Sequence, residues 1–63
     1  MTINEIRAFT QEVTKALWDA GRYAEGWQLS GYLYDIGYRP SEANAQWVLE
    51  AAQFYAADLA ANA

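Results

Sequence analysis

The stretch Asp35-Ile36-Gly37-Tyr38-Arg39-Pro40-Ser41-Glu42 separates two helical segments of the chain. Gly37 suits the left-handed position just beyond the end of a helix. Pro40 cannot continue a helix, and Ser41 is a residue type that caps the first turn of the next one. We therefore expect one helix over about residues 22–36 and another over about residues 42–60.

The segment after this turn is rich in alanine, the best helix former, which supports a long third helix. The segment before the turn is less uniform, because Gly26 and Gly31 each cost a helix roughly 1 kcal/mol relative to Ala. Its last part, residues 32–36, also has the aromatic content of a β-strand. A lone strand would find no partner elsewhere in the chain, so we expect a helix here.

The first segment opens with Thr2 and Glu5 in the spacing of a capping box, and Gly21 is placed to end the helix that they begin. At about 100° per residue, one face of this helix is apolar and consists of Ile3, Ile6, Phe9, Val13, Ala16, Leu17 and Ala20. The pattern predicts an amphipathic helix over about residues 3–20. Three helices with short connections predict an all-α fold, a compact three-helix bundle that forms one domain over residues 1–63.

The chain contains no Cys and no His, which excludes disulfides and the usual zinc sites. It also lacks the most common base for activating a nucleophile. The four glycines match no phosphate-binding motif, and the eight acidic residues are spread over all three helices. We therefore expect no enzyme activity, no metal and no cofactor.

The net charge of −4 argues against a nucleic-acid-binding surface, which needs clustered basic residues. Arg7, Lys15, Arg22 and Arg39 are scattered along the chain. The same charge disfavours anionic lipid, and no run of apolar residues is long enough for a membrane span. The N-terminal residues lack the basic and apolar segments of a signal peptide. These features predict a soluble, cytoplasmic protein that binds neither nucleic acid nor membrane.

Three Trp, five Tyr and two Phe are more rings than one core of this size accommodates. Phe9 and Tyr55 lie on apolar helix faces and are expected in the core, and Tyr38 is expected to fold onto the turn. Surplus rings belong on the surface, where Trp and Tyr often anchor protein partners.

Trp18 lies away from the apolar face of the first helix, and Trp47 and Phe54 share one flank of the third. We expect these three rings to contact a partner. For Trp18 a structural alternative stays open, in which the indole folds over the turn and covers the start of the second helix.

Tyr23, Trp27 and Tyr34 form a row on the second helix, beside a separate stripe of aliphatic residues. We expect the second helix to lie in a groove between the other two, which would bury both stripes. The alternative is that the row faces outward as a partner-binding surface with aromatic anchors.

Glu5, Glu12 and Asp19 repeat every seven residues and form an acidic stripe on the first helix. A solvated helix face, with Lys15 paired to its acidic neighbours, is the simple interpretation. The alternative is a surface that meets a basic groove on a partner.

These observations favour a non-enzymatic protein–protein interaction module. By analogy of composition, it would be a small phage or mobile-element accessory protein that binds and inhibits a larger host protein complex. The alternative is a self-assembling structural protein that forms a homodimer or higher oligomer through its aromatic surface. A small-molecule pocket lined by Trp27, Tyr34 and Tyr55 is a third hypothesis.

Overall fold

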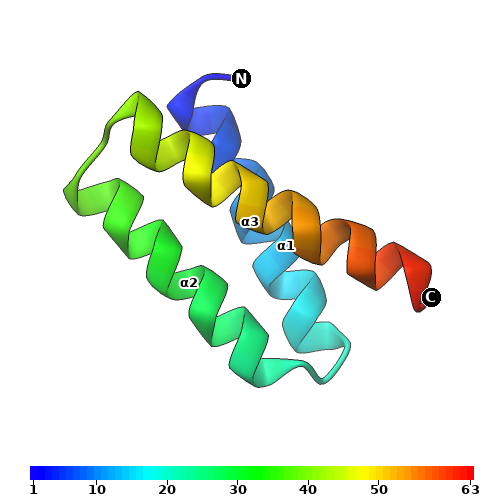
Figure 1. The fold of residues 1–63 in the computed structure, drawn as a ribbon. Helices are drawn as coiled ribbons and strands as arrows, with labels where there is room; N and C mark the ends of the chain where they lie inside the picture. Colours follow the sequence, from blue (N-terminus) through cyan, green and yellow to red (C-terminus); the bar gives the residue numbers. More distant parts are fainter.

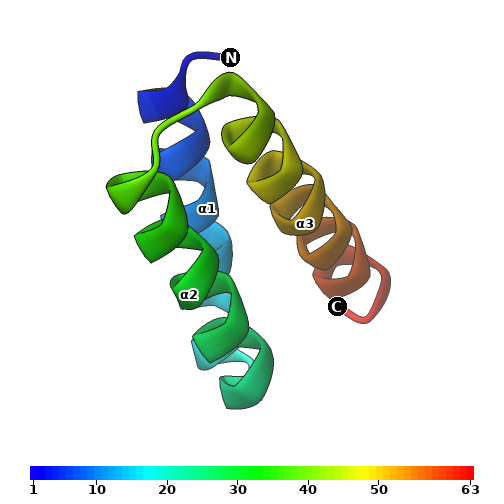
Figure 2. The ribbon, with the colours of Figure 1, turned by 60° about the vertical axis from the view of Figure 1, so that its left-hand side comes forward.

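The computed structural model describes residues 1–63 and contains three helices, α1 (Ile3–Asp19), α2 (Tyr23–Tyr38) and α3 (Glu42–Ala61). α1 packs against both α2 and α3 (Figure 1). Figure 2 shows α1 and α2 side by side, with α3 inclined to them. The expected all-α three-helix bundle is confirmed, and residues 32–36 are helical.

Both ends of α1 are formed by the residues that the sequence predicted. The Thr2 hydroxyl accepts the Glu5 backbone N–H at 3.1 Å, and the Glu5 carboxylate accepts the Thr2 backbone N–H at 2.9 Å. At the other end Gly21 has a φ of 77°, and the Arg22 backbone N–H donates to the Leu17 carbonyl at 2.8 Å. This is a Schellman motif, which requires a left-handed residue at the position of Gly21.

α2 continues two residues beyond its expected end at Ile36. Gly37 lies inside the helix, and its φ is not positive. The helix is capped by Arg39, whose φ of −132° and ψ of 68° lie outside the α-helical region. Because proline disfavours the helical conformation of the residue before it, Pro40 ends α2 and Gly37 does not. α3 then begins as predicted, with the Ser41 hydroxyl accepting the Asn44 backbone N–H at 3.1 Å.

The core is aliphatic. It consists of two clusters that share the partly buried Phe9 and Tyr32 at their edges, one made of Ile6, Ile36, Ala45, Val48 and Leu49 and the other of Val13, Leu17, Leu29 and Ala52. None of the aromatic residues is fully buried. Phe9 and Tyr55, which were expected in the core, are partly buried and pack against its margin.

Two buried threonines in α1 were missed from the sequence. Thr10 is completely buried and donates its hydroxyl hydrogen to the Ile6 carbonyl at 2.7 Å, and Thr14 donates to the Thr10 carbonyl at 2.8 Å. Since each hydroxyl is satisfied one turn back in its own helix, these polar side chains enter the interior without an unpaired group.

Candidate protein-binding surface

A row of exposed rings runs along α2. Tyr23, Trp27, Tyr34 and Tyr38, called here the α2 ridge, are 62–82% exposed. At about 100° per residue these positions fall within an arc of about 60°, on the side of the helix away from the buried Leu29. The expectation that α2 buries both of its stripes is wrong, because only the aliphatic stripe packs against α1 and α3 while the aromatic row faces outward.

Trp18 is not a spare ring. Its indole is half-buried and lies directly over Gly26, where an added Cβ would overlap the ring atoms Nε1 and Cδ1. The expectation that the fold does not need Trp18 is therefore wrong, and the alternative in which it covers the start of the second helix is confirmed. The contact of Trp18 with a partner stays a prediction. The indole also supports Trp27, whose ring centroid lies 5.6 Å away.

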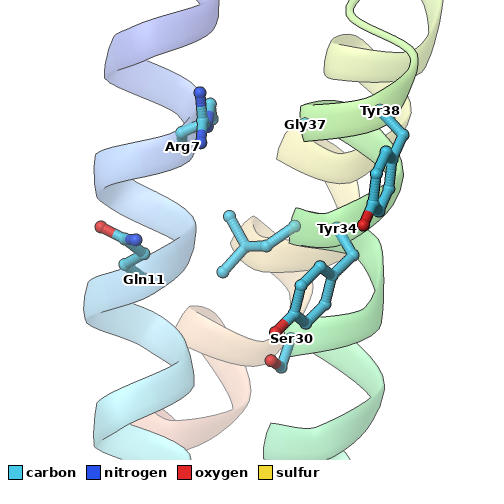
Figure 3. Close-up of a pocket in the computed structure, with 7 residues that line it drawn as sticks. Arg7, Gln11, Ser30, Tyr34, Gly37 and Tyr38 are labelled. Carbon is cyan, nitrogen blue, oxygen red and sulfur yellow. The ribbon is translucent and has the colours of Figure 1, made fainter.

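Tyr34 and Tyr38, at the C-terminal end of the α2 ridge, border an open groove of about 470 Å³ between α1 and α2. Arg7 and Gln11 from α1 line it together with Ser30, Tyr34 and Tyr38 from α2 (Figure 3). The Tyr34 and Tyr38 rings are stacked, with centroids 6.5 Å apart and planes 19° from parallel.

The position of Tyr38 corrects a prediction. Tyr38 was expected to fold onto the turn, but it is 82% exposed and belongs to the ridge, because α2 extends far enough to include it. The small-molecule pocket of the third hypothesis, lined by Trp27, Tyr34 and Tyr55, is not formed, since only Tyr34 of the three lines the groove. The Tyr55 hydroxyl instead donates to the Gln28 side chain.

Trp47 and Phe54, called here the α3 pair, form a second aromatic surface. Trp47 is 48% exposed and packs edge-on against Tyr32, with ring centroids 4.3 Å apart. Phe54 is 69% exposed, and its ring packs edge-on against the ring of Tyr55, with centroids 5.6 Å apart. Both rings of the pair are accessible, as the sequence predicted.

The acidic stripe is exposed along its length, at Glu5, Glu12 and Asp19. Glu5 has a structural task, because its hydrogen bonds to Thr2 in the helix cap lower the pKa of its carboxyl group. The expected pairs between Lys15 and its acidic neighbours are not formed, as the ion pairs of the structure involve Arg22 alone.

Arg22 forms an ion-pair cluster with Glu25 and Asp58 that joins α2 to α3. Its guanidinium contacts the Glu25 carboxylate at 2.6 Å through two hydrogen bonds and the Asp58 carboxylate on α3 at 2.5 Å. These bonds raise the pKa of Arg22 and lower that of Glu25. Partial burial raises the pKa of the neighbouring Tyr55. The cluster fastens the start of α2 to the last turns of α3.

The exposed surface of the candidate site is mainly aromatic. No group of His, Cys, Asp or Glu side chains is arranged to hold a metal ion. None of the helices is long and apolar enough to cross a membrane. Counting rings against core volume predicted the exposure of Trp47 and Phe54, whereas the exposure of Tyr23, Trp27 and Tyr34 was the alternative to their expected burial. The sequence prediction missed the groove, because the groove depends on which face of α1 meets α2.

Comparison of the chain with family models, with curated proteins and with solved structures gives no match.

Proposed function

We propose that this protein is a non-enzymatic protein-binding module whose exposed aromatic rings anchor another protein. The proposal rests on the exposure of the aromatic rings. Six of the ten are 48–82% exposed in a chain of 63 residues. Exposed apolar patches that are contiguous mark interaction sites more often than single exposed residues do.

The α3 pair is the surface that we assign to a larger partner. Its two rings lie seven residues apart, about 10 Å along the helix, which is the spacing of two anchors on one helix face. Tyr32 and Tyr55 hold them from behind, so little side-chain freedom is lost on binding. By covering part of a larger protein, a module of this size would inhibit it sterically, which is the role that we propose for it.

The test is binding by matched variants. A partner captured by the wild-type chain from a lysate of its source cells is purified, and its dissociation constant is measured by calorimetry. Replacing both rings of the α3 pair by serine is expected to weaken binding roughly tenfold or more. The control replaces Gln46 and Gln53, exposed polar residues of the same helix, by serine. Equal dissociation constants for the two double variants would refute the assignment.

The alternative function, self-assembly, is favoured for the α2 ridge by a separate observation, which concerns the spacing of its rings.

A further inference from the structure

The rings of the α2 ridge are placed symmetrically along the helix. Tyr23 and Tyr38 are equally far from the peptide bond between Ser30 and Gly31, and so are Trp27 and Tyr34. No charged side chain lies within their arc, and the outer side of α2 is covered by neither α1 nor α3 (Figure 1). We propose that the α2 ridge pairs with the α2 ridge of a second copy, antiparallel, in a two-fold symmetric dimer.

The symmetric spacing matches the requirement of such a dimer. In a two-fold symmetric interface each contact forms twice: where residue i of one copy contacts residue j of the other, residue j of the first also contacts residue i of the second. A two-fold axis that passes midway between the two helices, at the level of the Ser30–Gly31 bond of each, brings Tyr23 opposite Tyr38 and Trp27 opposite Tyr34 of the other copy, each pair twice. Ser30 and Gly31 at the centre are small, which lets the two helices approach, and the space beside Gly31 is open, since a Cβ built there has no other atom of its own chain within 4 Å.

The groove between α1 and α2 lies next to the position that Trp27 of the second copy occupies in this dimer. In an antiparallel two-fold pair, the α1 side of one copy faces the α1 side of the other. Trp27 leans toward α1, on the indole of Trp18. Its ring in the second copy therefore comes to lie over the groove beside Tyr34, within reach of the Arg7 guanidinium, which has no ion-pair partner in its own chain.

The available area is sufficient for a small dimer. With a side-chain surface of about 200 Å² per ring, the four exposed rings offer about 560 Å² per copy. A pairing that covers these rings completely buries about 1,100 Å² over the two copies, just above the roughly 1,000 Å² expected of a specific interface. The rings are also held in place before pairing, by Trp18 at one end and by the Tyr34–Tyr38 stack at the other. Antiparallel pairing further sets the two helix dipoles in opposite directions.

This inference rests on the proposed function, because it names the partner of one of the two aromatic surfaces. The first experiment is sedimentation equilibrium of the wild-type chain over a wide concentration range. We expect a species of twice the 7.1 kDa chain mass. Trp27→Ser is expected to weaken the association roughly tenfold or more, while Trp47→Ser, at the other surface, leaves it unchanged. Circular dichroism confirms that each variant is helical.

The second experiment tests the antiparallel direction by disulfide formation, using the fact that the chain has no cysteine of its own. Tyr23→Cys and Tyr38→Cys are mixed and oxidised with glutathione disulfide, which accepts the electrons of the two thiols. A disulfide requires Cα atoms within about 7 Å, and equal residues of two antiparallel copies are about 22 Å apart here. We therefore expect the mixture to yield at least about fivefold more cross-linked dimer than either variant alone.

A wild-type chain that stays at 7.1 kDa up to about 1 mM overturns the inference. So does cross-linking of Tyr23→Cys alone as efficiently as in the mixture, because that result indicates parallel helices. Loss of the dimer through Trp47→Ser, with Trp27→Ser unaffected, assigns the interface to α3 and also overturns it. The first two outcomes leave the binding test of the α3 pair untouched. The third places self-association on the α3 pair, and the calorimetric titration with the captured partner then shows separately whether that pair binds a larger protein. Failure of the dimer and failure of the proposed function are therefore distinguishable.

Discussion

Replacing Gly26 by alanine is expected to destabilise this protein, although alanine is the better helix former. Gly26 lies in the first half of α2, under the indole of Trp18. An added Cβ would overlap Nε1 and Cδ1 and would stand 3.2 Å from Cε2. The ring is rigid, so it can yield only by turning away from α2, which exposes the surface that it covers.

The size of the effect follows from two opposing terms. Alanine in a helix interior is worth up to about 1 kcal/mol over glycine. Forcing extra volume into a packed contact costs about 1–3 kcal/mol. Gly31 provides the matched control, because it lies in the same helix and a Cβ there meets nothing within 4 Å. Gly31→Ala should therefore stabilise the fold by up to about 1 kcal/mol, and the two variants should differ by about 1–3 kcal/mol.

Urea unfolding followed by circular dichroism measures this difference, and several protein concentrations separate it from self-association. In thermal unfolding, 1 kcal/mol corresponds to a shift of roughly 4–8 °C for a domain of this size. Removing the ring by Trp18→Ala should make Gly26→Ala stabilising, as at Gly31. If Gly26→Ala is as stable as Gly31→Ala in the wild-type background, Trp18 does not pack on α2 as described.

Three further predictions concern the core and the ionisable groups. Leu29→Ala, at a completely buried side chain, should lower the free energy of unfolding by about 2–5 kcal/mol, measured as a fall in the urea midpoint; a loss below about 1 kcal/mol would contradict its central position. The hydrogen bonds from Arg22 hold the pKa of Glu25 below its usual value of 4.5, so their stabilisation is complete above pH 4.5 and is lost as the pH falls through the pKa in the folded protein. As the pH falls from 7 to 2.5, the melting temperature should decrease less steeply for Glu25→Gln than for wild type. Glu12→Gln, at an exposed residue with no ion pair, is the control. Equal slopes for Glu25→Gln and wild type would show that the Arg22–Glu25 pair does not cause the loss of stability in acid. Burial raises the pKa of Tyr55 above its ordinary value of 10.0, so the unfolded chain loses this proton at a lower pH than the folded protein does. The free energy of unfolding should therefore decrease as the pH rises above 10, and should decrease less in Tyr55→Phe. An identical alkaline decrease in the two proteins would show that Tyr55 is not its source.

The helix boundaries that the sequence predicted correctly are those set by local geometry. Thr2, Ser41 and Gly21 act on backbone groups within a few residues, so their effect does not depend on the rest of the fold. The end of α2 was placed too early because Gly37 and Pro40 are both helix-ending signals, and only the backbone shows which of them acts.

The features that the sequence did not reveal depend on how the helices face one another. Two of these features join different helices: the contact of Trp18 with Gly26 and the ion pair of Arg22 with Asp58. The spacing of these residues in the sequence does not indicate that they meet. Thr10 and Thr14 resemble surface residues in a hydropathy pattern, but their hydroxyls bond within α1 and their small volume suits the interior.

The aliphatic core explains why so many rings are available for binding. Leucine, isoleucine, valine and alanine side chains fill the space between the helices, so Phe9, Trp18, Tyr32 and Tyr55 are placed at its margin and the other six rings outside it. Because the exposed rings contribute little to the packing of the monomer, replacing one of them should cost little stability and much affinity. The small core has a further consequence, since any dimer that covers the α2 ridge adds its binding energy to folding. The melting temperature of the wild-type protein should therefore rise with protein concentration, and that of Trp27→Ser should rise less.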